Sequence, residues 1–400
     1  MSIRPAFLAV ALGLSVLTAT ADDWPQWRGP NRDNHVTGFK APATWPKELT
    51  QKWKVTVGDG LASPALVGDK VYVFTRQGGD EVTRCLDAAT GKEIWADKYE
   101  AVAVTRPADG GGRFIGPRSS PAVADGKVCT LGVGGVVSCL DAVTGKVIWR
   151  KDTKTKPRFF TSSSPVIAEG VCVVYIGADG KGQLTAFDLA TGNEKWKWTG
   201  AGPSYGSPVV ATIAGTPQVV ALTSENLVGV GLADGKLLWQ ATSPKARYQT
   251  STPVVDGSTV ILGGTAITIE KSGDGFAAKP AWKGQASHQY NTPVLVDGRL
   301  YGLTGMGASG KLYCQDAKTG MVIWEDSTTR GECGTVLDAG GVLLALTSNS
   351  TLVAFKPGAK DYEEVAKYKV AETPTWASPI LAGNRLFVKD KDSLILWTIE

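Results

Sequence analysis

A nine-residue phrase that recurs along the chain constrains the fold more than any other feature. It reads D-A-A-T-G-K-E-I-W from Asp87 to Trp95, and close copies end at Trp149, Trp196 and Trp324. A more divergent copy, G-L-A-D-G-K-L-L-W, ends at Trp239. Self-similarity of this kind is typical of repeat architectures, in which one structural unit is used several times along the chain.

The tryptophan that closes the phrase gives the period. Successive gaps are 42, 54, 47, 43, 43 and 42 residues, between Trp53, Trp95, Trp149, Trp196, Trp239, Trp282 and Trp324. Tyr368 follows 44 residues later and is expected to take the same place. A second marker is a small hydroxyl residue before proline, as at Ser63-Pro64 and Ser120-Pro121, and Thr335-Val336 is a copy without the proline. The two markers together predict eight units.

Each unit except the last contains four short strand patterns separated by turn residues. In the first, Pro64–Val67 is apolar, Val71–Phe74 alternates, and the recurring phrase ends the third strand and begins the fourth. Four strands per unit at this period describe a β-propeller blade. The last unit lacks its fourth strand, and a spare one lies at residues 49–57, so pairing the two would close the ring and remove exposed edges. The sequence therefore predicts an all-β, eight-bladed propeller of four-stranded antiparallel blades.

The aspartates of the phrase (Asp87, Asp141, Asp188 and Asp316) are interpreted as turn caps. Aspartate side chains accept bonds from turn N–H groups, and the following Thr-Gly pair suits a tight turn because glycine tolerates positive φ. Turn chemistry explains these carboxylates, so we do not expect them to be catalytic.

The phrase resembles the tryptophan-docking motif A-x-D-x-x-T-G-K-x-x-W of propellers built from pyrroloquinoline quinone (PQQ) repeats. Ala186-Phe187-Asp188 keeps the motif's alanine, whereas Cys85, Cys139 and Cys314 stand there in other copies. The resemblance covers nearly all of the chain after the first residues. It implies the propeller fold, and it points to two kinds of relative, BamB-type envelope propellers and quinoprotein dehydrogenases. Propellers host many activities, so fold likeness does not choose between them.

The first 21 residues have the pattern of a cleavable secretory signal: Arg4, an apolar stretch from Ala6 to Leu17, and Ala19-Thr20-Ala21. No cysteine follows the expected cleavage point, so a lipid anchor is not indicated. We expect a periplasmic or secreted protein, monomeric and without a transmembrane segment. After residue 21 the chain has 41 basic and 38 acidic residues and no long basic run, which disfavours nucleic acid as a partner.

Two further segments complete the domain prediction. Residues 22–48 are rich in Pro, Asn and Asp without strand alternation, and we expect an irregular arm held on the ring by its tryptophans. Residues 49–400 are expected to be the propeller. The six cysteines are interpreted mainly as small buried residues, although Cys129 and Cys139 lie on neighbouring strands and a disulfide between them stays open.

Candidate functional residues lie in the loops that precede the Ser/Thr-Pro steps, here called rim loops, because these loops enter the innermost strands around a propeller's channel mouth. Nearly all of them carry an arginine, an aromatic residue, histidine or glutamate, and the Arg330 loop is among them. Aromatic faces with arginine suit an anionic, planar or sugar-like ligand. The competing interpretation is that bulky side chains simply fill the channel. The predicted ligand-binding residues are Arg118, Arg158, Tyr205, Tyr248, Gln249, His288, Tyr290, Glu332 and Trp376.

The resemblance to quinoproteins implies PQQ with a Ca²⁺ ion, an aspartate base and a tryptophan stacked on the quinone. Ca²⁺ requires several oxygen ligands together. The rim loops offer only Glu332, Asn291, Gln249 and Gln289, with Trp376 as the stacking residue, and no aspartate lies beside them. The chain has only two histidines, His35 and His288, which excludes a histidine-rich zinc site.

Three functions follow from these patterns. The first is an exported, non-enzymatic module that binds or scaffolds an envelope protein or a polar ligand and needs no cofactor. The second is a PQQ- and Ca²⁺-dependent alcohol or sugar dehydrogenase, and the third is a carbohydrate-binding propeller that uses Tyr205, Tyr248, Tyr290 and Trp376.

Overall fold

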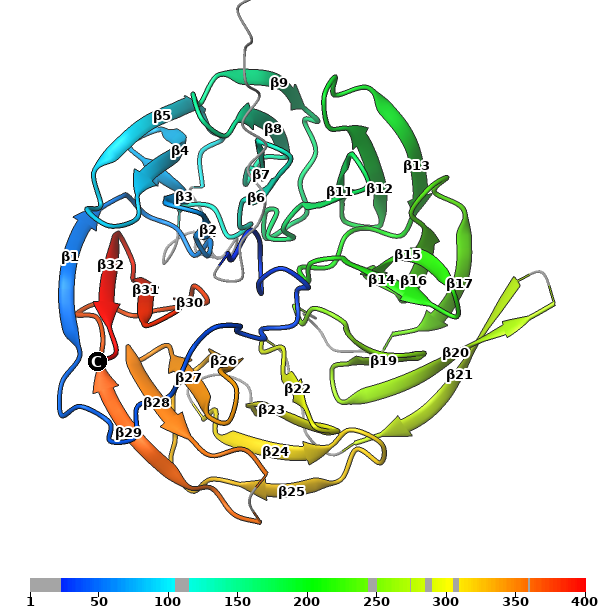
Figure 1. Ribbon diagram of the computed structural model, residues 1–400. Helices are drawn as coiled ribbons and strands as arrows, with labels where there is room; N and C mark the ends of the chain where they lie inside the picture. The colour runs from blue at the N-terminus through cyan, green and yellow to red at the C-terminus, as the bar shows by residue number, and fades with distance from the viewer. Residues whose placement is uncertain are drawn as a thin grey trace, which may run out of the picture.

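The computed structural model describes residues 23–104, 115–243, 250–273, 275–284, 290–304, 309–358 and 360–400. Every regular element within these ranges is a β-strand, and the strands form eight four-stranded antiparallel sheets arranged as the blades of a ring (Figure 1). The predicted eight-bladed propeller is therefore confirmed.

The blades follow one another in chain order. Blade one is β2 (Ala65–Val67), β3 (Lys70–Gln77), β4 (Asp80–Asp87) and β5 (Glu93–Glu100); blade two is β6 (Ala122–Ala124), β7 (Lys127–Leu131), β8 (Val136–Asp141) and β9 (Val147–Asp152). Blade three is β10 (Val166–Ala168), β11 (Val171–Ala178), β12 (Lys181–Asp188) and β13 (Glu194–Gly200); blade four is β14 (Val209–Ile213), β15 (Thr216–Leu222), β16 (Asn226–Gly231) and β17 (Leu237–Thr242).

The second half repeats the same order. Blade five is β18 (Val254–Asp256), β19 (Thr259–Leu262), β20 (Thr265–Ser272) and β21 (Gly275–Lys283); blade six is β22 (Val294–Val296), β23 (Arg299–Leu303), β24 (Leu312–Asp316) and β25 (Val322–Glu325). Blade seven is β26 (Gly334–Asp338), β27 (Leu343–Thr347), β28 (Thr351–Phe355) and β29 (Glu364–Lys369). Blade eight combines β30 (Ile380–Ala382), β31 (Arg385–Lys389) and β32 (Ser393–Thr398) with β1 (Thr50–Thr56).

The ring closes in blade eight, as the spare N-terminal strand predicts. β1 pairs antiparallel with β32 and is the outermost strand of that sheet, so strands from both ends of the chain share one blade. Lys389 of β31 is fully buried, and its ammonium donates to the Gly60 carbonyl at 2.7 Å, joining blade eight to the loop that enters blade one. Closure leaves no blade without a neighbour, which protects the sheet edges.

The recurring phrase fastens each blade to the next. Asp141 caps its turn, its Oδ1 accepting the Thr144 N–H at 2.7 Å, and Asp87, Asp188 and Asp316 do the same in their blades. Gly145 of that turn has φ +72°, and a Cβ there would lie 2.6 Å from the ring of Trp95 in the preceding blade. The Trp95 indole N–H donates to the Ala142 carbonyl at 3.2 Å. The Asp, Gly and Trp of the phrase are therefore explained by the turn and by packing between blades.

One feature of the repeat differs from the prediction. In the other blades the tryptophan pairs with the residue just before a β-bulge, as Trp95 pairs with Cys85. In blade seven that place belongs to Ala366, which pairs with Ala354. Tyr368 lies two residues further along, where its ring packs near Trp45 and its hydroxyl donates to the Pro46 carbonyl at 2.7 Å. The expectation that Tyr368 replaces the tryptophan is wrong, because spacing alone does not locate the bulge.

The cysteines are free, and five of them are buried in the blade cores. Cys129 and Cys139 are direct cross-strand partners in blade two, yet both are free thiols. Burial, together with the neighbouring Cys139 and Cys172 thiols, raises the pKa of Cys129 well above its ordinary value. The interpretation of the cysteines as small buried residues is confirmed for all but Cys333, which is partly exposed.

Candidate functional site

The rim loops gather on one face of the ring. Strand direction alternates within each blade, so the turn after the innermost strand and the Thr-Gly turn share one face, whereas the rim loops lie on the opposite face. The innermost strands are β2, β6, β10, β14, β18, β22, β26 and β30. Each of them pairs with its own blade on one side only, so its other edge borders the central channel.

The N-terminal arm occupies this channel. Figure 1 shows the segment after residue 22, in dark blue, crossing the centre of the ring. Trp24 exchanges two backbone hydrogen bonds with Leu66 of β2, at 2.8 and 2.9 Å. Further along the arm, His35 Nδ1 lies 2.7 Å from Asp338 Oδ2 of blade seven, and the Val36 N–H donates to the Asp338 carbonyl. The arm therefore crosses the middle of the ring and is bonded to blade one and to blade seven.

Two buried arginines of the arm bind the free edges of the innermost strands. Arg28 donates to the carbonyls of Thr292 and Pro293 in blade six, at 3.1 and 2.8 Å. Arg32 donates to the carbonyls of Pro165 and Pro208, in blades three and four. Burial lowers the pKa of Arg28 to about 10 and that of Arg32 to about 9, so both remain charged at neutral pH. They satisfy strand-edge carbonyls that would otherwise be buried without donors.

A belt of hydroxyl groups joins the blades at the Ser/Thr-Pro steps. The residue before the proline donates its backbone N–H to the hydroxyl at the same position of the next blade. Six such bonds run around the ring, with N···O distances from 2.7 to 3.4 Å. The Thr335 and Ser378 hydroxyls bond each other at 2.9 Å. We refer to this set as the hydroxyl belt: Ser63, Ser120, Ser164, Ser207, Thr252, Thr292, Thr335 and Ser378.

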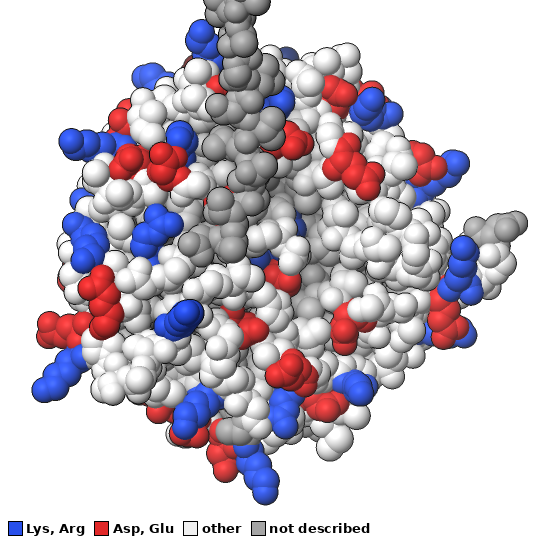
Figure 2. Space-filling model, in the orientation of Figure 1, with Lys and Arg blue, Asp and Glu red and all other residues white. Residues whose placement is uncertain are grey.

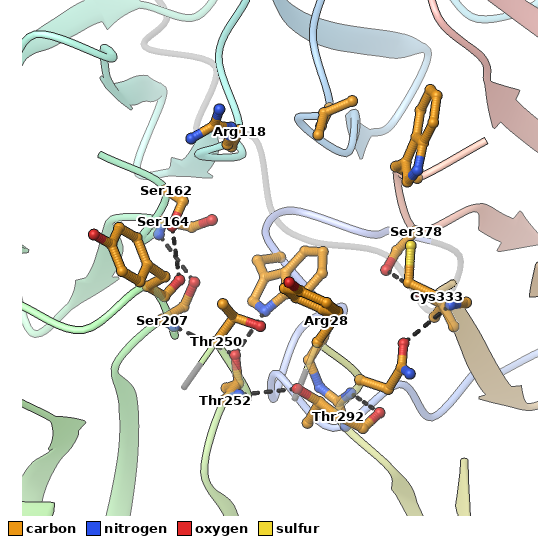
Figure 3. Close-up of a pocket in the computed structure, with 18 of the residues that line it drawn as sticks. Arg28, Arg118, Ser162, Ser164, Ser207, Thr250, Thr252, Thr292, Cys333 and Ser378 are labelled. Carbon is orange, nitrogen blue, oxygen red and sulfur yellow. Dashed lines mark hydrogen bonds between the residues drawn. The ribbon is translucent and has the colours of Figure 1, made fainter. Parts of the chain in front are cut away.

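A cavity of about 700 Å³ lies between the arm and the rim loops. Trp27 and Arg28 of the arm are among its lining residues, and the Trp27 indole N–H donates to Thr252 of the belt at 3.1 Å. Figure 3 shows Arg118 on one side of the cavity and Thr292 and Cys333 on the opposite side. Protein pockets that bind small ligands have volumes of about 300–1,000 Å³, so the cavity is of suitable size.

The structure brings five of the nine predicted ligand-binding residues together. Arg118, Tyr205, Tyr290, Glu332 and Trp376 all line this one cavity. Arg158 is exposed outside the lining, and its guanidinium lies 5.5 Å from the centre of the Phe159 ring. Tyr248, Gln249 and His288 lie outside the described residues, as does Gln289.

Two other rim-loop residues have structural partners. Arg330 is buried and does not line the cavity, because it forms an ion pair with Asp326 at 2.7 Å and donates to the Tyr362 hydroxyl at 2.8 Å. Arg330 therefore lies in its rim loop as expected, but its side chain is directed to these partners and not to the cavity. Asn291 lines the cavity, but its Oδ1 accepts the Gly334 N–H at 3.0 Å and its Nδ2 donates to the Leu303 carbonyl.

The described donors around the cavity do not fit a Ca²⁺ ion with its quinone. Among the described lining residues Glu332 is the only carboxylate, and both ends of the Asn291 amide are engaged. In the part of the chain that the structure describes, no three His, Cys, Asp or Glu side chains are grouped to hold a metal. Ca²⁺ takes six to eight oxygen ligands, so this set is too small.

Sequence reasoning missed the arm's part in the cavity and the hydroxyl belt. The belt had a signal in the sequence, because a hydroxyl residue recurs at the same position of all eight units. Figure 2 shows positive and negative side chains interspersed over the visible face, in keeping with the nearly balanced charge.

The fold and the cavity define a PQQ-repeat propeller, and comparison with known proteins agrees. The family model described as "Outer membrane protein assembly factor BamB" matches residues 79–326, and the chain belongs to this family of PQQ-like propellers. A BamB of Burkholderia pseudomallei is 25% identical over 366 residues, covering 86% of each chain. A polyvinylalcohol dehydrogenase of a Pseudomonas species is 23% identical, over 89% of this chain and 61% of that protein.

Solved structures support the fold alone. Quinohemoprotein alcohol dehydrogenase from Comamonas testosteroni superposes with a TM-score of 0.71 at 16% identity, over 94% of this chain and 80% of that one. BamB from Moraxella catarrhalis gives 0.65 at 14% identity, over 88% and 98%. No helix among the described residues is long and apolar enough to cross a membrane.

Proposed function

We propose that this chain is an exported, non-enzymatic propeller of the cell envelope that holds a partner protein at its rim-loop face. The observation that carries the proposal is the cavity between the rim loops and the arm. Its lining residues differ from blade to blade, whereas the belt and the turns repeat. Loops on a rigid scaffold are common binding sites. The family match supports a scaffold role, since its members include outer membrane protein assembly factors.

Crosslinking in living cells tests this proposal. A photoreactive amino acid replaces Tyr290, which is 40% exposed at the cavity, and as the matched control it replaces Met321, which is 69% exposed on the opposite side of the same blade. We expect a discrete crosslinked envelope protein from position 290 and none from position 321. No product at position 290, or the same product at both positions, would contradict the proposal.

A quinoprotein dehydrogenase is the second candidate, favoured by the sequence likeness to a polyvinylalcohol dehydrogenase. The purified protein is titrated with PQQ and Ca²⁺ while quinone absorbance and dye-linked alcohol oxidation are followed. The scaffold proposal expects neither a spectral change nor turnover. Turnover that depends on added PQQ would replace it with the dehydrogenase.

A further inference from the structure

Arg118 is one of two arginines among the described residues that line the cavity. It comes from the rim loop of blade two, and its Nη1 donates to the Phe159 carbonyl of the next rim loop. Among the described residues no carboxylate forms an ion pair with it, whereas Arg150 pairs with Asp97 and Arg330 pairs with Asp326. A guanidinium has five N–H donors, and the described contacts use one of them.

This position is electrostatically costly without a ligand. Burial lowers the pKa of Arg118, because the charged form loses hydration, although arginine remains a cation at neutral pH. Buried charges in proteins are normally paired, and the planar guanidinium matches the two oxygens of a carboxylate. An anion that enters the cavity would match this charge.

The rest of the lining suits an apolar group. Trp27, Leu61, Tyr205, Tyr290 and Trp376 contribute aromatic or aliphatic surface around the same space. Aromatic side chains provide large apolar contact areas with a fixed geometry.

The other charges of the lining limit the ligand's charge. Four of the five donors of Arg28 are already engaged with backbone carbonyls. Glu332 adds a negative charge three blades away from Arg118 in the ring order. Among the described lining residues, a dianion such as phosphate would meet one available cation and one like charge, so a monoanion is favoured.

We propose that the cavity binds an amphipathic monocarboxylate, with the carboxylate on Arg118 and an aromatic or aliphatic body against the surrounding rings. Both a small free acid and the C-terminus of a peptide ending in an apolar residue have this chemistry. The inference rests on the proposed function only in assigning binding to this face.

Calorimetric titration of the full-length mature protein tests the inference with two matched pairs of probes. The first pair is 3-phenylpropionate and its neutral amide, and the second is N-acetyl-Gly-Gly-Phe with a free carboxylate and with a C-terminal amide. At least one free carboxylate should bind saturably with 1:1 stoichiometry and about 10- to 100-fold more tightly than its amide, the range expected for a charge-assisted bond. The pair that shows this difference identifies the source of the carboxylate.

Variants connect the binding to Arg118. Arg118→Gln should weaken carboxylate binding about tenfold or more. Arg118→Lys should give intermediate affinity, since lysine keeps the positive charge but cannot form the bidentate hydrogen bonds of a guanidinium. Arg158→Gln is the control, because it removes the same charge from the neighbouring rim loop outside the cavity. It should leave affinity within twofold. Unfolding curves for each variant verify that the ring is intact.

Three results would overturn the inference: equal affinity for acid and amide, no binding of any probe, or full affinity in a folded Arg118→Gln protein. If Arg118→Gln itself fails to fold, the Arg118→Lys protein and the acid–amide comparison on the wild type decide. A crosslink at position 290 without carboxylate binding would refute this inference and leave the scaffold proposal standing.

Discussion

The hydroxyl belt predicts a large difference between two adjacent, chemically identical substitutions. Ser119 and Ser120 are both fully buried serines in the rim loop that enters blade two. The Ser120 hydroxyl accepts the buried Ser63 N–H at 2.9 Å, whereas the Ser119 hydroxyl has no partner among the described residues. Ser120→Ala and Ser119→Ala each remove one oxygen at the same depth, so the belt bond is what distinguishes them.

The expected magnitudes follow from the partner that each substitution leaves behind. Ser120→Ala leaves the buried Ser63 N–H without an acceptor, which costs about 1–3 kcal/mol of stability. Ser119→Ala removes an unpaired buried hydroxyl and should be neutral or slightly stabilising. The unfolding entropy is about 2.1 cal/mol/K per residue near 60 °C, or about 0.8 kcal/mol/K for the whole chain, so Ser120→Ala should lower Tm by about 1–4 °C.

Urea unfolding followed by tryptophan fluorescence measures the free energy, and calorimetry measures Tm. Ser164→Ala and Ser163→Ala form a second pair of the same design, since Ser164 accepts the Ser120 N–H at 2.9 Å and the Ser163 hydroxyl lacks a partner in the described ranges. If both members of a pair lose equal stability, the belt bonds contribute nothing beyond burial, and the reasoning is refuted.

Three further predictions concern the arm, the turns and the thiols. The bond to Asp338 raises the pKa of His35, so the contribution of this histidine to stability is present below pH 6.5 and is lost as pH rises through its folded-state pKa. The difference in urea midpoint between wild type and His35→Gln should therefore become smaller as pH rises. A difference that does not depend on pH would contradict this. Gly145→Ala should destabilise the protein more than Gly126→Ala. Both glycines have positive φ, but only at Gly145 would an added Cβ lie against an indole ring, 2.6 Å away. Equal urea midpoints for the two variants would count against a role for the contact between Gly145 and the indole ring. A thiol reagent should label Cys333 alone among the six cysteines of the native protein, and mass spectrometry that finds a second labelled thiol would disprove this.

The repeat made the fold predictable because its signals are local. The turn caps and the Thr-Gly pairs act within a few residues, the Ser/Thr-Pro steps are recognisable as local dipeptides, and closure by residues 49–57 follows from counting strands. The error at Tyr368 shows the limit of counting. A β-bulge moves the register by one residue, and blade seven lacks the phrase that marks its position elsewhere.

The cavity was only partly predictable from the sequence, because one of its sides is formed by the N-terminal arm, which is far in sequence from most of the blades that it contacts. Arg28 contacts residues 264 and 265 positions away, and no spacing within residues 22–48 indicates which strands the arm will meet. Rim-loop position also does not fix side-chain direction. Arg118 faces the cavity, whereas Arg330, in the rim loop of blade seven, is directed toward Asp326.

The joint between blades six and seven explains why Asn291 serves structure rather than a ligand. At six of the other joints the belt connects neighbouring blades through a backbone N–H and a hydroxyl, and between blades seven and eight it does so through two hydroxyls, which leaves rim-loop side chains available for other contacts. Blade seven has Val336 in place of proline, and its innermost strand begins one residue before Thr335, at Gly334. There the Asn291 amide accepts the Gly334 N–H and so supplies a link between the two blades. Rim positions next to intact belt bonds, such as Arg118, are therefore the better places for ligand chemistry.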